Sequence, residues 1–278
     1  MKELYLDCNA HLPPSKRILD KYAEISSSRA GHGHPLSLSK PGRDAAYILE
    51  SSRQSIAQLI GAQASNQIIL TYSCTQACEW GMEIFNGMSK KDNTFHSILC
   101  SPLEHPAIRE PFQKQLNINE FNGFCDVDKN GIIKLDSLSK SDYLITHHVQ
   151  SEIGLIQPIK EIKERVKFLF CDMSQSLGKI PVNVTQLDVD IAVFGAHKFG
   201  GWGGVGFMYL KDPQYWIPFG TGSRYFTDRT GTPDVASIAA TAEALKESID
   251  NFKERDNNCK EFKEILELGL KERNWEII

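Results

Sequence analysis

Lys198 is the residue of this sequence whose setting best suits covalent chemistry. It ends the segment Gly195-Ala196-His197-Lys198, which follows a short apolar run and precedes a glycine-rich loop. A lysine held at the end of a strand can form a Schiff base with a carbonyl compound when its surroundings lower its pKa. An isolated lysine is more often a solvated surface residue, so the interpretation depends on the side chains that the fold brings to Lys198.

Asp172 offers a carboxylate at a corresponding place, directly after the apolar run 168–171. Ligands of open α/β sheets bind outside the carboxyl ends of the strands. A carboxylate at that edge could hold the protonated ring nitrogen of pyridoxal 5'-phosphate (PLP), which is the partner that makes this cofactor an electron sink. Gln175, three residues later, can reach the same side of the turn.

Two further segments could complete a site of this kind. Ser73-Cys74-Thr75-Gln76 stands between an expected strand and an expected helix, where backbone N–H groups and the Thr75 hydroxyl suit a phosphate. His105 follows another expected strand and could stack on an aromatic ring, although that residue alone is more simply interpreted as a loop histidine. The glycine-rich segment 201–206 matches G-x-G-x-x-G, but it precedes a strand instead of opening a helix. We therefore reject a dinucleotide site.

The elements that must position these residues alternate along the chain. Most of the expected strands are continuous apolar runs, which are typical of strands buried on both faces. They lie at 68–71, 97–100, 118–121, 143–146, 168–171, 191–194 and 205–210. Helices are expected at 44–60 and 75–88, from Pro106, from Pro158, and over 233–270 with a break near Asn257-Asn258. This order predicts an α/β fold with a mostly parallel seven-stranded sheet and helices on both faces.

Composition excludes several classes of protein. The 278 residues include 31 basic and 35 acidic residues, a net charge of −4, which argues against a polycationic nucleic-acid binder. No run of about 18 apolar residues predicts a transmembrane helix, and the first residues lack the apolar core of a secretion signal. We expect neither nucleic acid nor a membrane as a partner.

Seven cysteines are scattered along the chain without a C-x-x-C pair. A secreted disulfide framework would be even in number and clustered, so we expect a reducing, cytoplasmic location. Cys74 and Cys78 have the i,i+4 spacing of a helix, but a metal site would need further ligands that the sequence does not name. We therefore predict packing or site-lining cysteines and no metal.

The ordered set of these motifs resembles the class V aminotransferase family, and within it the cysteine desulfurases of the NifS/IscS type. The segments that carry the resemblance are Tyr5-Leu6-Asp7, Ser73-Cys74-Thr75, Glu104-His105, 148–154, 172–179 and His197-Lys198. The resemblance runs from Tyr5 to about Ala244. It implies the large domain of a PLP-dependent transferase of fold type I over 1–232, with an N-terminal arm. A long helical region over 233–278 would then lead to a smaller domain.

The resemblance also implies roles for single residues. Lys198 would link PLP covalently and later move the substrate Cα proton. Asp172 would pair with the ring nitrogen, Gln175 would bind the ring hydroxyl, and His105 would stack on the ring. Cys74, Thr75 and His197 would bind the phosphate. Further cofactor contacts would come from Ser151, where the family usually has an asparagine, and from Gly195, where it often has a serine.

The implied reaction is the desulfuration of L-cysteine, or of a similar amino acid, to alanine with transfer of sulfur to an acceptor. Thr232 matches a threonine that reaches the phosphate of a neighbouring subunit, which implies a homodimer. The family carries its sulfur-accepting cysteine and its carboxylate-binding arginine in a following domain, for which this sequence has no counterpart. We therefore expect impaired turnover unless a complementing subunit supplies them. The alternatives are a non-catalytic or split-subunit protein of this fold, or another class V aminotransferase or lyase activity.

Overall fold

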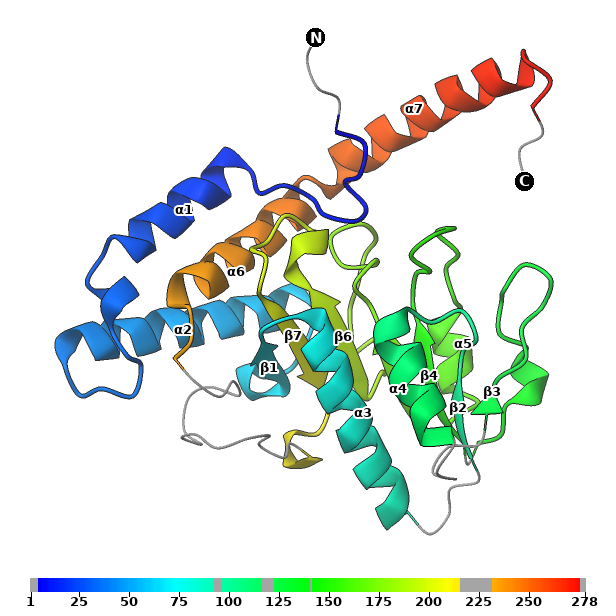
Figure 1. The fold of residues 1–278 in the computed structure, drawn as a ribbon, viewed down its shortest axis with the longest axis horizontal. Coiled ribbons are helices and arrows are strands. Elements are labelled where there is room, and N and C mark those ends of the chain that lie inside the picture. Colours follow the sequence, from blue (N-terminus) through cyan, green and yellow to red (C-terminus); the bar gives the residue numbers. More distant parts are fainter. Residues whose placement is uncertain (1–4, 93–96, 117–122, 141, 216–231, 276–278) are drawn as a thin grey trace.

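The computed structural model describes residues 5–92, 97–116, 123–140, 142–215 and 232–275. Within them, one mixed sheet has the strand order β1-β7-β6-β5-β4-β2-β3 (Figure 1). β7 runs antiparallel to β1 and β6, and the other neighbours pair in parallel. The strands are β1 Ile68–Thr71, β2 Ile98–Cys100, β3 Gly123–Phe124, β4 Tyr143–His147, β5 Phe168–Asp172, β6 Ile191–Gly195 and β7 Gly206–Leu210. The predicted mostly parallel, seven-stranded α/β sheet is confirmed.

Two cores enclose the sheet, one on each face. Helices α3 (Cys74–Lys91) and α4 (Pro106–Leu116) pack on one face. The opposite core includes residues of α1 (Lys16–Ser26), α2 (Lys40–Leu59), α5 (Ile159–Lys163) and α6 (Val235–Asp250). Neighbouring strand residues alternate between the two cores, so that Phe170 packs with α3 while Cys171 packs on the other side. Continuous apolar runs were therefore the correct signal for doubly covered strands.

The expected strand at 118–121 lies outside the described residues. The third strand that the structure does describe, Gly123–Phe124, was not predicted. It is two residues long and neither residue is fully buried, so no apolar run announced it. Helix α1 was also not predicted, although Ile18 and Ile25 on one of its faces are buried.

The C-terminal helical region breaks earlier than predicted. The expectation of a break near Asn257-Asn258 was wrong, because α6 ends at Asp250 and α7 (Phe252–Lys271) begins after Asn251. α6 is largely buried, whereas α7 has no buried residue among those described and projects away from the sheet (Figure 1). The break thus falls where the chain leaves the packed body, a tertiary cause that local residue types do not reveal. The division of the chain at residue 232 remains a prediction.

No helix among the described residues is both long enough and apolar enough to cross a membrane.

Candidate active site

A cavity of about 190 Å³ lies where the carboxyl ends of β4, β5 and β6 face the first turn of α3. This volume is below the roughly 300–1,000 Å³ of pockets for drug-sized ligands, so it suits a small ligand. Its lining contains every predicted site residue except Gly195 and Thr232. The lining residues are Cys74, Thr75, Cys78, Leu103, His105, Ala107, His147, Val149, Gln150, Ser151, Asp172, Ser174, Gln175, His197 and Lys198.

Asp172 is positioned by the turn that follows β5. Its Oδ1 accepts a hydrogen bond from the backbone N–H of Ser174 at 2.8 Å, and its own carbonyl accepts from His148 N at 2.8 Å. These two contacts hold the half-buried carboxylate at the edge of the sheet. Because β5 and β6 are parallel, the same edge receives the segment that follows β6, which carries His197 and Lys198.

The first turn of α3 forms the opposite wall. Ser73 Oγ caps the helix by accepting from Gln76 N at 3.1 Å, and Cys74 and Thr75 follow it at the cavity. The first N–H groups of a helix have no partner within the helix, so they and the helix dipole favour an anion. Gly206 lets this backbone approach β7, because a Cβ there would lie 2.4 Å from the carbonyl carbon of Ser73.

Lys198 is held by residues 8–12, called the N-terminal segment below, and does not point freely into the cavity. Its Nζ donates to the carbonyl oxygens of Ala10 at 3.0 Å and Asn9 at 3.3 Å. The segment is itself fixed by the hydrogen bond from Leu12 N to His197 O at 2.9 Å. The N-terminal residues thus form one side of the site.

Asn9 connects several of the predicted residues. Its Nδ2 donates to Ser151 O at 2.9 Å, its Oδ1 accepts from Lys179 Nζ at 2.6 Å, and its carbonyl accepts from Gln175 Nε2 at 3.4 Å. Lys179 also donates to Gln175 Oε1. Burial, with Lys198 and Arg255 nearby, lowers the pKa of Lys179 to about 8. Sequence reasoning missed Asn9, because nothing in its local pattern signals a role.

His197 lines the cavity as a neutral imidazole near pH 7. Burial lowers its pKa to about 4, and the charges of Lys198, His11 and Lys179 act in the same direction. A neutral ring can donate one hydrogen bond to a ligand oxygen without adding charge. Gly195 is buried beneath it, and a Cβ there would lie 3.1 Å from His197 Cε1. A serine at this position would therefore displace the imidazole slightly.

A buried polar chain lies behind the cavity at the end of β4. His147 Nδ1 lies 2.6 Å from Glu104 Oε1, and its Nε2 lies 3.4 Å from Gln157 Nε2. Burial raises the pKa of Glu104, while its hydrogen bond with His147 acts against that rise. In the sequence motifs Glu104 appears only beside His105, with no role of its own, and His147 was not predicted. The signal for His147 was its place at the end of an apolar strand, the feature that identified Asp172.

The remaining predicted residues lie at the margin of the cavity or outside it. His105 is exposed just before α4, with its Nδ1 accepting from Ala107 N at 3.1 Å, and it lines the cavity mouth. Thr232 is exposed and lines neither this cavity nor the second cavity that adjoins it.

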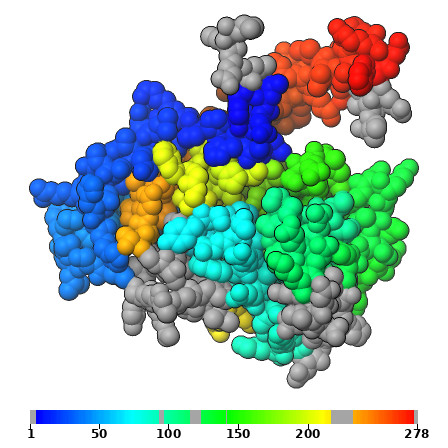
Figure 2. All heavy atoms as spheres, viewed as in Figure 1, coloured from blue at the N-terminus to red at the C-terminus, as the bar shows by residue number. Residues whose placement is uncertain are grey.

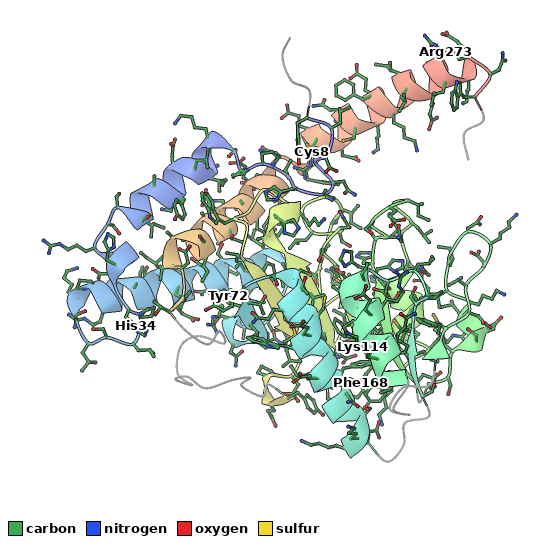
Figure 3. All side chains as sticks on the ribbon, viewed as in Figure 1. Cys8, His34, Tyr72, Lys114, Phe168 and Arg273 are labelled. Carbon is green, nitrogen blue, oxygen red and sulfur yellow. The ribbon has the colours of Figure 1, made fainter. Side chains whose placement is uncertain are left out.

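A second cavity, of about 260 Å³, adjoins the first and shares Lys198 with it. It is lined by the N-terminal segment and the start of α7, and Figure 3 shows Cys8 beside those first turns. Among the seven cysteines, all of them free, only Cys8 and Cys259 are exposed, and both line this cavity with Lys179 and Arg255. Nothing in the sequence pattern placed Cys259 near Lys198.

Comparisons with known proteins agree with this fold. The family model described as aminotransferase class-V matches residues 4–273. Cysteine desulfurase IscS of Dictyoglomus turgidum is 30% identical, over 98% of this chain and 69% of that protein. Putative cysteine desulfurase IscS 1 of Bacillus subtilis is 29% identical, over 96% of this chain and 72% of that protein. A solved NifS-like protein superposes with a TM-score of 0.87 at 26% identity, covering 97% of this chain and 76% of its own.

These features define an α/β protein with the architecture of fold type I transferases, and its candidate site is a cavity at the carboxyl edge of the sheet. The chain belongs to the class V aminotransferase family. Within that family it is similar to the cysteine desulfurases of the IscS and NifS type, as its motifs predicted.

Proposed function

We propose that this protein binds PLP in the cavity of Asp172 and Lys198 and removes sulfur from L-cysteine, leaving alanine. The observation that carries the proposal is the meeting of an amine, a carboxylate and a helix N-terminus in one small cavity. The names of the relatives, which are cysteine desulfurases, support the choice of substrate.

The residues of the cavity fit the chemical parts of the cofactor. Lys198 would hold it covalently, and Asp172 would bind its ring nitrogen. The first turn of α3, with Thr75 and the neutral His197, would bind its phosphate. His105 at the mouth would cover one face of its ring. All of these side chains line one cavity, so one small ligand can touch them together.

When bound, PLP supplies an electron sink conjugated to the Cα of an amino acid. Asp172 keeps a proton on the ring nitrogen by charge and by hydrogen bonding, which maintains that sink. Lys198 Nζ accepts the proton from Cα and can return it to carbon, as a general base and then a general acid. Gln175, held by Lys179, orients the ring through its hydroxyl.

Desulfuration also needs a thiol that accepts sulfur and a cation that binds the substrate carboxylate. The second cavity contains both kinds of group beside Lys198: the thiols of Cys8 and Cys259, and the cations of Lys179 and Arg255. We assign sulfur acceptance to one of these two thiols. We further propose that the protein forms a homodimer in which the exposed Thr232 takes part. It would pass sulfur to an external acceptor or work with a complementing subunit, and it would be located in the cytoplasm.

A second candidate is a PLP-binding protein without turnover. It is favoured by the two carbonyl contacts of Lys198 Nζ, which engage the amine with the N-terminal segment. The two candidates differ in whether the free amine of Lys198 moves a proton of the substrate in the protein that holds the cofactor.

The test combines cofactor binding with product analysis. PLP added to the purified chain should give a protein-bound absorbance band, and borohydride reduction followed by peptide mass analysis should locate the label on Lys198. Lys198→Ala should lose the label, whereas Lys211→Ala, which is remote from both cavities, should keep it. L-cysteine should then yield alanine and reduced sulfur. Binding without alanine would favour the second candidate, and a label on another lysine would refute the site.

A further inference from the structure

The thiols of Cys74 and Cys78 meet the carboxylate of Asp172 at the inner wall of the candidate active site. Their ligand atoms, two Sγ and one carboxylate oxygen, all lie within 4.8 Å of one another. The cysteines stand one turn apart at the start of α3, and Asp172 ends β5 on the facing sheet. The third ligand that the sequence could not name is therefore supplied by the fold.

This donor set has a definite metal preference. Two thiolates and one carboxylate are ligands that bind Zn²⁺, which takes sulfur at about 2.3 Å and carboxylate oxygen at about 2.0–2.2 Å. Ligand atoms around one tetrahedral ion lie roughly 3.5–4 Å apart at these bond lengths. Small side-chain rotations would bring the three atoms to that spacing. On the side of the ion that faces the cavity, the three ligands would leave the fourth coordination position to water. This position would lie beside Ser174 Oγ, which is 2.9 Å from Cys74 Sγ.

The surroundings of this cluster favour a cation. Glu104 is 3% exposed, and its Oε2 has no hydrogen-bond partner within the part of the chain that the structure describes. Glu104 interacts electrostatically with both Asp172 and Cys78. Lys198, the one lysine or arginine among the described lining residues, donates to the carbonyls of Asn9 and Ala10. Two carboxylates thus act on the two thiols, that of Asp172 in the cavity lining and that of Glu104 buried behind it.

We propose that the protein without PLP binds one Zn²⁺, or a similar thiophilic divalent cation, at Cys74, Cys78 and Asp172, and that this metal and PLP exclude each other. Binding replaces the two thiol protons with the metal and changes no oxidation state. The exclusion rests on the proposed function, because it assumes that Asp172 and the first turn of α3 hold PLP. The metal site itself does not depend on that assumption.

Cobalt titration of the cofactor-free protein tests the site, because Co²⁺ bound by thiolates shows sulfur-to-metal charge-transfer bands. One equivalent of Co²⁺ should produce these bands, and Zn²⁺ should abolish them. Cys78→Ala and Cys74→Ala should each weaken binding by more than the roughly 10–100-fold that loss of an outer-shell partner causes. Cys171→Ala is the matched control, because this buried thiol precedes Asp172 but packs in the opposite core. Asp172→Asn, which keeps the side-chain shape, should weaken binding without removing a thiol.

The outcomes separate the two halves of the proposal. Absence of the bands in the unaltered protein overturns the site, as does their persistence in both Cys74→Ala and Cys78→Ala. Zn²⁺ should lower the apparent affinity for PLP in the unaltered protein and in Cys171→Ala, but not in Cys78→Ala. Equal PLP binding with and without Zn²⁺ overturns the exclusion. Failure of every form to bind PLP refutes the proposed function, while the cobalt spectrum still decides the metal site.

Discussion

The ammonium of Lys198 donates a hydrogen bond to the backbone carbonyl of Ala10 at 3.0 Å. This contact brings the first part of the chain onto the end of β6, and Figure 2 shows the dark blue N-terminal residues lying on the yellow segment below them. A nucleophilic amine needs its lone pair directed at the carbonyl that it attacks. Lys198 must therefore turn from the N-terminal segment toward the cavity when it reacts, and the segment is part of the site.

Asn9→Ala should weaken the attachment of the N-terminal segment to the site and lower the stability of the protein. The Asn9 side chain contributes one acceptor for the half-buried Lys179 and one donor for Ser151 O. Hydrogen bonds to charged groups contribute about 1.5–3 kcal/mol, so the free energy of unfolding should fall by about 1–3 kcal/mol in urea denaturation. Asn130→Ala, on an exposed turn, is the control and should change it by less than about 0.5 kcal/mol. An unchanged midpoint in Asn9→Ala would show that these bonds do not hold the segment.

Asp172→Ala should impair PLP binding more than Gln175→Ala does. Asp172 is the one carboxylate among the described residues that line the cavity, so it can pair with a positively charged ring nitrogen, whereas Gln175 offers a neutral hydrogen bond. Removing one partner of a buried charged pair commonly costs about 3–5 kcal/mol, and the half-exposed position of Asp172 places the effect at the lower end. Absorbance titration with PLP measures both affinities. Equal losses in the two variants would contradict the assignment of Asp172 to the ring nitrogen.

His197 should make stability depend on pH in a defined window. Its pKa is about 4 in the folded protein, below the ordinary value of 6.5, so between these values the unfolded chain binds more protons. Stability should therefore rise as pH increases from about 4 to 6.5, by up to about 1.4 kcal/mol per pH unit for one such group. His197→Gln should reduce this slope in denaturation measured at several pH values, and the exposed His34→Gln should not. A slope that is unaffected by His197→Gln would refute the half-buried, neutral state of this ring.

Much of the fold could be predicted from the sequence, because most strands are marked by the apolar residues that they themselves contain. The runs that became β4, β5 and β6 are nearly continuous apolar runs, and both faces of these strands are covered. β3 could not be found in this way, since Gly123 and Phe124 are not fully buried. The helix break at Asn251 escaped prediction because it depends on where α6 stops packing against the body.

The site could be predicted where its residues end strands or begin helices. Asp172, Lys198 and Cys74 occupy such positions, so topology alone brings them together. Asn9 and Cys259 could not be found, because they reach the site through the N-terminal segment and through the direction of α7. Both depend on packing between residues far apart in the sequence, which leaves no periodic or spacing signal.

The proposed reaction needs a protein thiol that accepts sulfur. In desulfuration the Cβ–S bond of the substrate breaks, its sulfur bonds to a protein thiol, and Cβ gains a proton to give alanine. Proximity of the acceptor can contribute many kcal/mol to such a step, so the acceptor thiol must come within reach of the sulfur of a substrate bound at Lys198. Cys8 is adjacent in the chain to Asn9, whose carbonyl lies 3.3 Å from Lys198 Nζ, whereas Cys259 approaches from the exposed helix α7.

Cys8→Ser should therefore reduce alanine release from L-cysteine more than Cys259→Ser does, by at least about tenfold, while leaving PLP binding unchanged. Arg255→Met should instead raise the KM for L-cysteine, because it removes a cation from the cavity that would receive the carboxylate. Lys260→Met, an exposed change on α7, serves as the control for both. Alanine release can be followed by mass spectrometry under reducing conditions with saturating PLP. If activity survives in the Cys8→Ser, Cys259→Ser double variant, the acceptor is not in this cavity, and the remaining candidates are Cys74 and Cys78 of the first cavity or a thiol supplied by another chain or molecule.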